Sequence, residues 1–259
     1  MIETASEKRP WQPSAFGIFA RPQTAAALVA AWLAAALFFN LFPQIDLAVS
    51  HFFFDEDAMA QGLRMHGLLF PLLTSGPLNL CRDIMQYGTV ALAVVVLASI
   101  IVETFLHHSL IDSMVRARTT LLLVYLLGPL LFANVLTKPL VGRPRPLQTD
   151  VFGGDAPFVP AAQFSSNCTS SCSFVSGEAA SHFWLFGLLA IVPQHLRLAV
   201  LVPLTVLVGF SAMLRVSFGA HFLSDVVLGG FSTLVLYALT ASVLEYARFL
   251  PWIARRVAD

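Results

Sequence analysis

Residues 119–146 have the sequence TTLLLVYLLGPLLFANVLTKPLVGRPRP, an uncharged apolar run followed by a basic, proline-rich segment. A helix rises about 1.5 Å per residue, so the apolar part, 119–137, would span about 28 Å. The hydrocarbon core of a bilayer is about 30 Å thick. The stretch therefore predicts a transmembrane helix whose end carries Lys138, Arg143 and Arg145 at a membrane surface.

The composition of the whole chain is also that of a membrane protein. Of its 259 residues, 57% are hydrophobic and 12% are charged, whereas soluble domains average about 25% charged residues. The mean hydropathy is +0.77. The formal net charge is zero, so no basic field favours binding to nucleic acid. We predict an all-α, polytopic membrane protein.

Apolar stretches along the chain predict a six-helix transmembrane bundle. Two of them, 179–193 and 198–214, are separated by a short polar turn, which is typical of a tight helical hairpin. The interval 43–87 is predicted to form interfacial or re-entrant structure, because its apolar pieces are too short to cross a bilayer. The six stretches are, in order, 24–42, 88–106, 119–137, 179–193, 198–214 and 226–244.

The distribution of Lys and Arg predicts which surface faces the cytoplasm. Outside the polar clusters described below, basic residues concentrate on the side of the two termini, and short basic segments usually stay cytoplasmic. Residues 1–23 and 248–259 are therefore predicted to be cytoplasmic segments on either side of a membrane domain, 24–247. In a bacterium, the opposite surface would be the periplasmic face of the inner membrane.

Polar residues near the helix ends form three clusters. The chain crosses the membrane and returns between the second cluster and the third, so all three lie on one surface in either orientation. Charges near a bilayer are costly and usually functional. The clusters are Lys138, Arg143 and Arg145; Ser176, Gly177, Glu178 and His182; and Arg215, His221 and Asp225.

Several of these residues suit a bound phosphate group. Lys138, Arg145 and Arg215 supply positive charge and hydrogen-bond donors for its oxygens. Ser176 and Gly177 open a helix, where free backbone N–H groups favour an anion. The combination predicts a phosphate site.

The third cluster contains a candidate nucleophile. His221 and Asp225 lie four positions apart, so on a helix the carboxylate can hold one imidazole N–H and leave the other nitrogen free to attack phosphorus. A second group is then needed to protonate the leaving oxygen. We therefore predict phosphoryl transfer through His221.

The pattern Lys-x6-Arg-Pro, Ser-Gly and Arg-x5-His-x3-Asp resembles the three-part signature of the type 2 phosphatidic acid phosphatase family, whose fold is shared with vanadium haloperoxidases. The resemblance covers about 119–244. It implies a membrane lipid phosphatase that forms a phosphohistidine at His221, with Asp225 orienting the imidazole, and that needs no metal or other cofactor. It also implies phosphate ligands at Lys138, Arg145, Arg215 and the backbone of Ser176 and Gly177.

Two positions depart from the family signature. Leu214 stands where a Ser usually precedes the Arg, and Glu178 replaces the His that protonates the leaving oxygen. Glu178 could donate that proton if burial raised its pKa, although nearby cations act in the opposite direction. His182, on the same helical face and about 6 Å deeper, is the second candidate, and the absence of any working acid is the third.

The loop before Ser176 contains Cys168 and Cys172, four residues apart. Outside the cytoplasm they are predicted to form a disulfide that holds this loop. No second Cys/His cluster accompanies them, so no metal site is predicted. Arg143 falls outside the motif spacing and is interpreted as a supporting residue that helps recruit an anionic head group.

The main functional prediction is an integral membrane phosphatase that hydrolyses a phosphomonoester or diphosphate of a lipid at the outer leaflet. Candidate lipids are phosphatidic acid, phosphatidylglycerol phosphate, undecaprenyl diphosphate and a lipid A phosphate. One alternative is a phosphotransferase, which passes the phosphoryl group to an acceptor other than water. Another is a non-catalytic binder or transporter of phosphorylated lipid, because Glu178 replaces the usual His. The sequence indicates no oligomeric state.

Overall fold

The computed structural model describes residues 15–63, 65–107 and 113–246. Helices and loops make up these residues, and β-pairing among them is limited to an isolated bridge between Thr149 and Ala156. The expected all-α class is confirmed. Most of the predicted terminal segment 1–23, and all of 248–259, lie outside the described residues.

Five helices in the described part of the chain are long and apolar enough to cross a membrane. The third is a continuous rod in which a π-helical segment, Leu126–Thr137, joins two α-helices. Pro129 lies inside that segment, and a proline cannot donate the usual backbone hydrogen bond. The five are α1 (Pro22–Leu41), α5 (Gly76–His107), the rod of α6 (Ser113–Tyr125) and α7 (Lys138–Val141), α9 (Arg197–Ser217) and α10 (Leu223–Tyr246).

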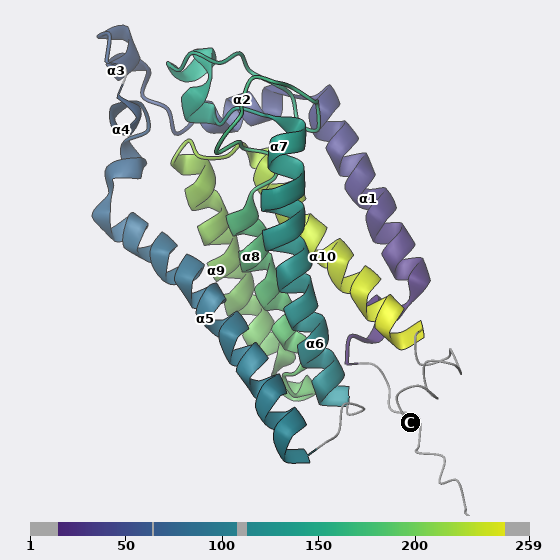
Figure 1. The fold of residues 1–259 in the computed structure, drawn as a ribbon. Coiled ribbons are helices and arrows are strands. Elements are labelled where there is room, and N and C mark those ends of the chain that lie inside the picture. The colour runs from purple at the N-terminus through teal and green to yellow at the C-terminus, as the bar shows by residue number, and fades with distance from the viewer. Residues whose placement is uncertain (1–14, 64, 108–112, 247–259) are drawn as a thin grey trace, which may run out of the picture.

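The predicted helix at 179–193 is shorter than expected. It consists of α8 (Gly177–Trp184) and a 3₁₀ turn, Leu185–Ala190. Most of α8 is buried, and it packs against α9, α10 and the α6–α7 rod (Figure 1). The Tyr237 hydroxyl donates to Trp184 O at 2.7 Å, so α10 satisfies the carbonyl at which α8 ends. The count of six crossings therefore stays a prediction.

The interval 43–87 differs from the prediction in its second half. α2 (Gln44–His51), α3 (Glu56–Ala60), α4 (His66–Leu69) and a 3₁₀ turn fill its first part, but α5 already begins at Gly76. The Asn79 amide donates to the carbonyls of Leu73 and Ser75, at 2.7 and 3.0 Å, and so closes the chain onto this early start. The expected start at 88 was wrong, because it followed hydropathy alone.

The loops and short helices gather at one end of the bundle. Figure 1 shows α2, α3, α4 and the long loop after α7 at this end, whereas the first residues of α1 and the last of α10 lie at the other. The N-terminal ends of α8 and α10 and the C-terminal ends of α7 and α9 also lie there. The three polar clusters are therefore carried to the same end of the molecule.

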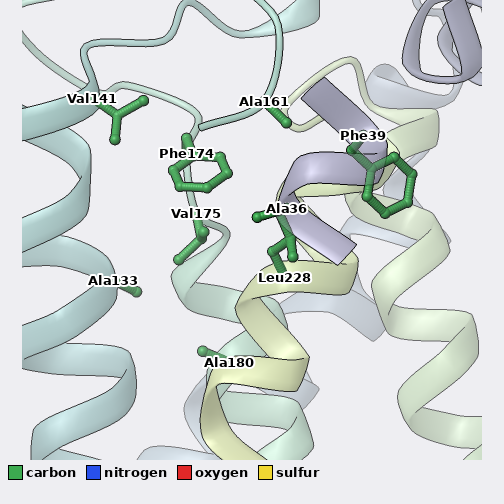
Figure 2. Close-up of a cluster of buried hydrophobic side chains, with 9 residues drawn as sticks. All are labelled: Ala36, Phe39, Ala133, Val141, Ala161, Phe174, Val175, Ala180 and Leu228. Atoms are coloured by element: carbon green, nitrogen blue, oxygen red, sulfur yellow. The ribbon is translucent and has the colours of Figure 1, made fainter. Parts of the chain in front are cut away.

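A buried apolar cluster fixes the long loop on the bundle (Figure 2). Phe174 and Val175, just before α8, are buried with side chains from α1, the π-helical segment, α8 and α10. The Asn40 amide of α1 also donates to Ala161 O of the loop at 2.8 Å. The cluster consists of Ala36, Phe39, Ala133, Val141, Ala161, Phe174, Val175, Ala180 and Leu228. The loop therefore has a defined position beside the polar residues.

Candidate active site

The basic segment after the α6–α7 rod is turned by a glycine. Gly142 has φ +60°, and a Cβ there would lie 2.0 Å from Ser165 O, so only glycine fits. The Lys138 ammonium donates to Asn134 Oδ1 at 2.6 Å, and the Arg145 Nε donates to Ser171 O at 2.6 Å. Both cations are half-buried and held in place by neutral acceptors, which leaves their charge available to an anion.

The start of α8 is packed closely between two other helices. The Ser176 hydroxyl accepts from Ala179 N and caps α8, while Ser176 N donates to Asp225 O at 3.0 Å. The expectation that Ser176 N binds phosphate is therefore wrong, because this N–H already has a partner. A Cβ at Gly177 would lie 2.8 Å from the Asn134 amide, and a Cβ at Gly229 would lie 2.5 Å from Ser176 O. Small residues therefore bring the N-terminus of α8 against both α10 and the helix that carries Lys138.

The imidazole of His221 is oriented by a backbone carbonyl. Its Nδ1 lies 2.9 Å from Ser173 O. A carbonyl can only accept, so Nδ1 carries the proton, and no hydrogen bond from the described residues reaches Nε2. The expected direct bond from Asp225 is wrong: that carboxylate accepts from the Ser173 hydroxyl and from Phe222 N. Asp225 thus acts on the imidazole through Ser173, which lies between them.

The electrostatic environment of His221 includes the charges of three basic residues from separate segments of the chain. Burial lowers the pKa of His221 well below its ordinary value, and the charges of Arg215, Arg145 and Lys138 lower it further. The side chain is 2% exposed. The ring is therefore neutral at physiological pH, as a nucleophile must be.

Glu178 forms ion pairs with two arginines. Arg82 donates from Nε to Oε2 at 3.0 Å and from Nη2 to Oε1 at 2.8 Å, and Arg215 Nη2 lies 3.3 Å from Oε1. Burial alone would raise the pKa of this carboxyl, but the hydrogen bonds from Arg82 and the charge of Arg215 outweigh it, and the net shift is downward. This geometry is that of an ionised carboxylate rather than a protonated acid.

His182 lies deeper and keeps one ring nitrogen without a partner. Its Nδ1 is 2.8 Å from the Ser211 hydroxyl of α9. Its Nε2 is buried and makes no hydrogen bond with the described residues. A buried polar atom without a partner is unusual and is typical of sites that bind a ligand, an ion or water.

The interpretation of Arg143 as a head-group contact is corrected by the structure. Its side chain is fully buried, with Nη2 2.7 Å from Asp46 Oδ2 and Nη1 2.6 Å from Asp225 Oδ1. Nε donates to Val159 O, and the guanidinium stacks 4.3 Å from the centre of the Phe222 ring. Arg143 therefore pairs with two buried carboxylates and joins α2 to the start of α10.

Comparison with known proteins identifies the family. The family model of the PAP2 superfamily matches residues 118–249. A protein of Rhizobium etli named Lipid A 4'-phosphatase is 39% identical over 251 residues, which cover 93% of this chain and 96% of the relative. The chain belongs to the PAP2 superfamily.

Two further relatives of this PAP2 protein carry the same name, Lipid A 4'-phosphatase. The one from Rhizobium leguminosarum is 41% identical over 83% of this chain and 93% of its own length. The one from Francisella tularensis subsp. novicida is 38% identical over 57% of this chain and 71% of its own length. No solved structure matches the chain. The expectation of a membrane-bound phosphatase of the PAP2 type is confirmed.

Sequence reasoning missed three residues of the PAP2 site. Arg82 falls in the interval 43–87, for which interfacial or re-entrant structure was predicted, but it lies on α5 and pairs with Glu178. Asp46 lies in a segment without a motif, and Ser173 was treated only as part of the cysteine loop. Carboxylates and arginines are rare in this chain, so the position of Arg82 and Asp46 near helix ends could have identified them as candidate site residues. No sequence feature distinguishes Ser173.

The loop before α8 carries a disulfide between Cys168 and Cys172, at the spacing for which it was predicted. Cys81 is free. Among the described residues, no group of three or more His, Cys, Asp or Glu side chains is arranged to hold a metal ion.

Proposed function

We propose that this membrane lipid phosphatase removes the 4′-phosphate of lipid A at the periplasmic face of a bacterial inner membrane. The observation that carries the proposal is the 39% identity to a Lipid A 4'-phosphatase over nearly the full length of both chains. The relatives' name specifies a phosphate ester at a defined position of a defined lipid. The named activity requires a cationic phosphate site and a nucleophile, and the geometry provides candidates for both.

The proposed reaction begins with the phosphate between the three cations Lys138, Arg145 and Arg215. His221 Nε2 attacks phosphorus, an N–P bond forms, and the P–O bond to the lipid breaks. The cations stabilise the charge on the equatorial oxygens as this happens. Water then attacks the phosphohistidine, which releases inorganic phosphate and restores the neutral imidazole.

Protonation of the leaving oxygen is the step at which this chain departs from its family. Both carboxylate oxygens of Glu178 face arginines, whereas His182 keeps Nε2 without a partner. We therefore assign Glu178 to charge balance around Arg82 and Arg215. His182 is the proton donor in this proposal: as an imidazolium it donates from Nδ1 to the Ser211 hydroxyl and from the otherwise free Nε2 to the leaving oxygen. The negative charge of the bound phosphate favours this imidazolium.

The proposed sidedness rests on two independent features. The Lys and Arg bias assigns the termini to the cytoplasm, and the site lies at the opposite end of the bundle from the first and last described residues. The Cys168–Cys172 disulfide lies in the loop at the site end, and disulfides persist in oxidising compartments such as the periplasm. Both features agree with a periplasmic active site.

The proposal is tested by phosphate release from purified lipid A, followed by mass spectrometry of the product. We expect loss of the 4′-phosphate without an added acceptor, and loss of activity by at least 1,000-fold in His221→Ala, on the order expected when a nucleophile is removed. Release that requires a lipid acceptor would support a phosphotransferase. Unchanged function of His221→Ala would support a non-catalytic binder.

A further inference from the structure

A polar pocket lies in the long loop beside the phosphate site. Its volume is about 360 Å³, toward the lower end of the range of small-molecule sites. The lining side chains are amides, hydroxyls and one carboxylate, together with three small residues. They are Gln148, Gly154, Asp155, Ala156, Asn167, Cys168, Thr169 and Ser170.

Hydrogen bonds attach the pocket to Arg145 on two sides. The Gln148 side chain accepts from Arg145 N at 2.8 Å. The Arg145 Nε donates to Ser171 O at 2.6 Å, next to the lining residue Ser170. A group bound in the pocket would therefore lie next to a phosphate held by Arg145.

Both walls of the pocket are fixed in the free protein. In the first wall, Ala156 N donates to Gln148 O and Asp150 N donates to Ala156 O, at 2.9 and 2.8 Å. The second wall is Asn167–Ser170, and all of it except Asn167 lies within the loop closed by the Cys168–Cys172 disulfide. Its ends are bonded to the segment before Arg145, through Ser165 N to Val141 O and Ser173 N to Arg143 O. A site with this much internal bonding loses little entropy on binding.

The lining chemistry selects a polyhydroxylated ligand. Amides and hydroxyls can both donate and accept, and Asp155 accepts from a hydroxyl or an amino group. No apolar side chain larger than alanine or cysteine lines the pocket, so an acyl chain would gain little there. A sugar ring presents donors and acceptors around its edge and matches such a surface.

We propose that this pocket is a sugar subsite, which binds the glucosamine ring of the lipid head group while its phosphate lies on Arg145, Lys138 and Arg215. This inference rests on the proposed function and extends it, because it assigns head-group selection to the loop rather than to the phosphate ligands. Asn167, Thr169 and Asp155 are the specificity-determining side chains. Gln148 is a positioning residue for Arg145.

The test compares two water-soluble phosphomonoesters that differ in the sugar. Full-length protein carrying His221→Ala, which cannot turn them over, is titrated with glucosamine 4-phosphate and with glycerol 3-phosphate by calorimetry. We expect the sugar phosphate to bind about tenfold more tightly, the factor expected from roughly two neutral hydrogen bonds. Asn167→Ala combined with Asp155→Asn should remove this preference. Inorganic phosphate should bind with equal affinity to the His221→Ala protein and to the same protein carrying the two additional substitutions.

Gln163→Ala is the matched control, because it removes an exposed amide from the same loop outside the pocket; it should keep the preference. Equal affinities for the two esters before mutation, or a preference that survives the double substitution, would overturn the subsite. A protein that prefers the sugar phosphate but releases no phosphate from lipid A would support the subsite and contradict the proposed substrate.

Discussion

At the scale of single residues, the charge state of Glu178 decides how the leaving oxygen is protonated. Its two ion pairs make it an anion that partly neutralises Arg82 and Arg215. Removing that charge in Glu178→Gln should strengthen inhibition by inorganic phosphate several-fold, because the site becomes more positive. The turnover number should change little, whereas loss of a general acid typically lowers it by about 100-fold or more.

His182→Gln is the comparison, and it is expected to show that larger loss of kcat. Both substitutions are measured by initial rates at saturating substrate, which report kcat. The assignment fails if Glu178→Gln, rather than His182→Gln, shows the larger loss of kcat.

The pKa of His221 makes a separate prediction for acid pH. Burial and three nearby cations hold this pKa well below its ordinary value, so the imidazole stays neutral and nucleophilic as the pH falls through about 6.5. The acid limb of kcat/KM is therefore expected below that pH. If the acid limb has a pKa at or above the ordinary histidine value, the charges of Lys138, Arg145 and Arg215 do not lower the pKa of His221 as argued.

Arg143 makes a prediction about stability. It lies between Asp46 and Asp225, all three with fully buried side chains, so Arg143→Met would leave two carboxylates without their cation. Removing one partner of a buried ion pair costs about 3–5 kcal/mol. Thermal unfolding in detergent should show a large fall in Tm, partly restored by adding Asp46→Asn. A Tm equal to that of the parent protein would mean that the network contributes little.

The same residues show what sequence reasoning can reach at this scale. Lys138, Arg145, Arg215 and His221 were predicted as site residues because their spacing suits phosphate chemistry and the chain has few charged residues. Arg143 was assigned the wrong role, since nothing in a linear pattern distinguishes a buried guanidinium from an exposed one. The route from Asp225 to His221 through Ser173 depends on a loop conformation that no motif encodes.

At the scale of elements, the close approach of α8 to α10 positions the phosphate site. Gly229→Ala would place a methyl group 2.5 Å from Ser176 O, so α8 would have to move away from the bundle. Activity is expected to fall by 100-fold or more, the effect of about 1 Å of misplacement. Gly209→Ala is the control, because nothing lies within 4 Å of its Cβ on α9. Equal activity of both variants would contradict this role.

The observed helix boundaries show which helices hydropathy predicted correctly and which it did not. Long helices such as α1 and α10 were found from apolar runs, because lipid contact demands them. α5 starts earlier than its apolar run, since its first turns carry polar residues toward the site, including Arg82. α8 is shorter than its apolar run, because Tyr237 of α10 bonds the carbonyl of Trp184 and the backbone changes to a 3₁₀ turn.

At the scale of the whole molecule, connectivity brings the site together. The number of membrane crossings between the three polar clusters predicted that they share one surface. Figure 1 shows α2, the long loop and the ends of α7, α8 and α9 at the same end of the molecule. Which side of the membrane this end faces depends on the charge bias and the disulfide, neither of which involves the catalytic residues. Sidedness is therefore testable without affecting activity.

Cysteine labelling in intact spheroplasts makes that test. In a Cys81→Ser background, Ser166→Cys adds an exposed thiol at the site end and His195→Cys adds one in the turn before α9, at the other end. A membrane-impermeant maleimide should label Ser166→Cys before lysis and His195→Cys only after it, because a charged reagent does not cross the hydrocarbon core. The two loop cysteines are already paired and should not react. The reverse order of labelling would place the phosphate site in the cytoplasm, where lipid A of the outer leaflet could not reach His221.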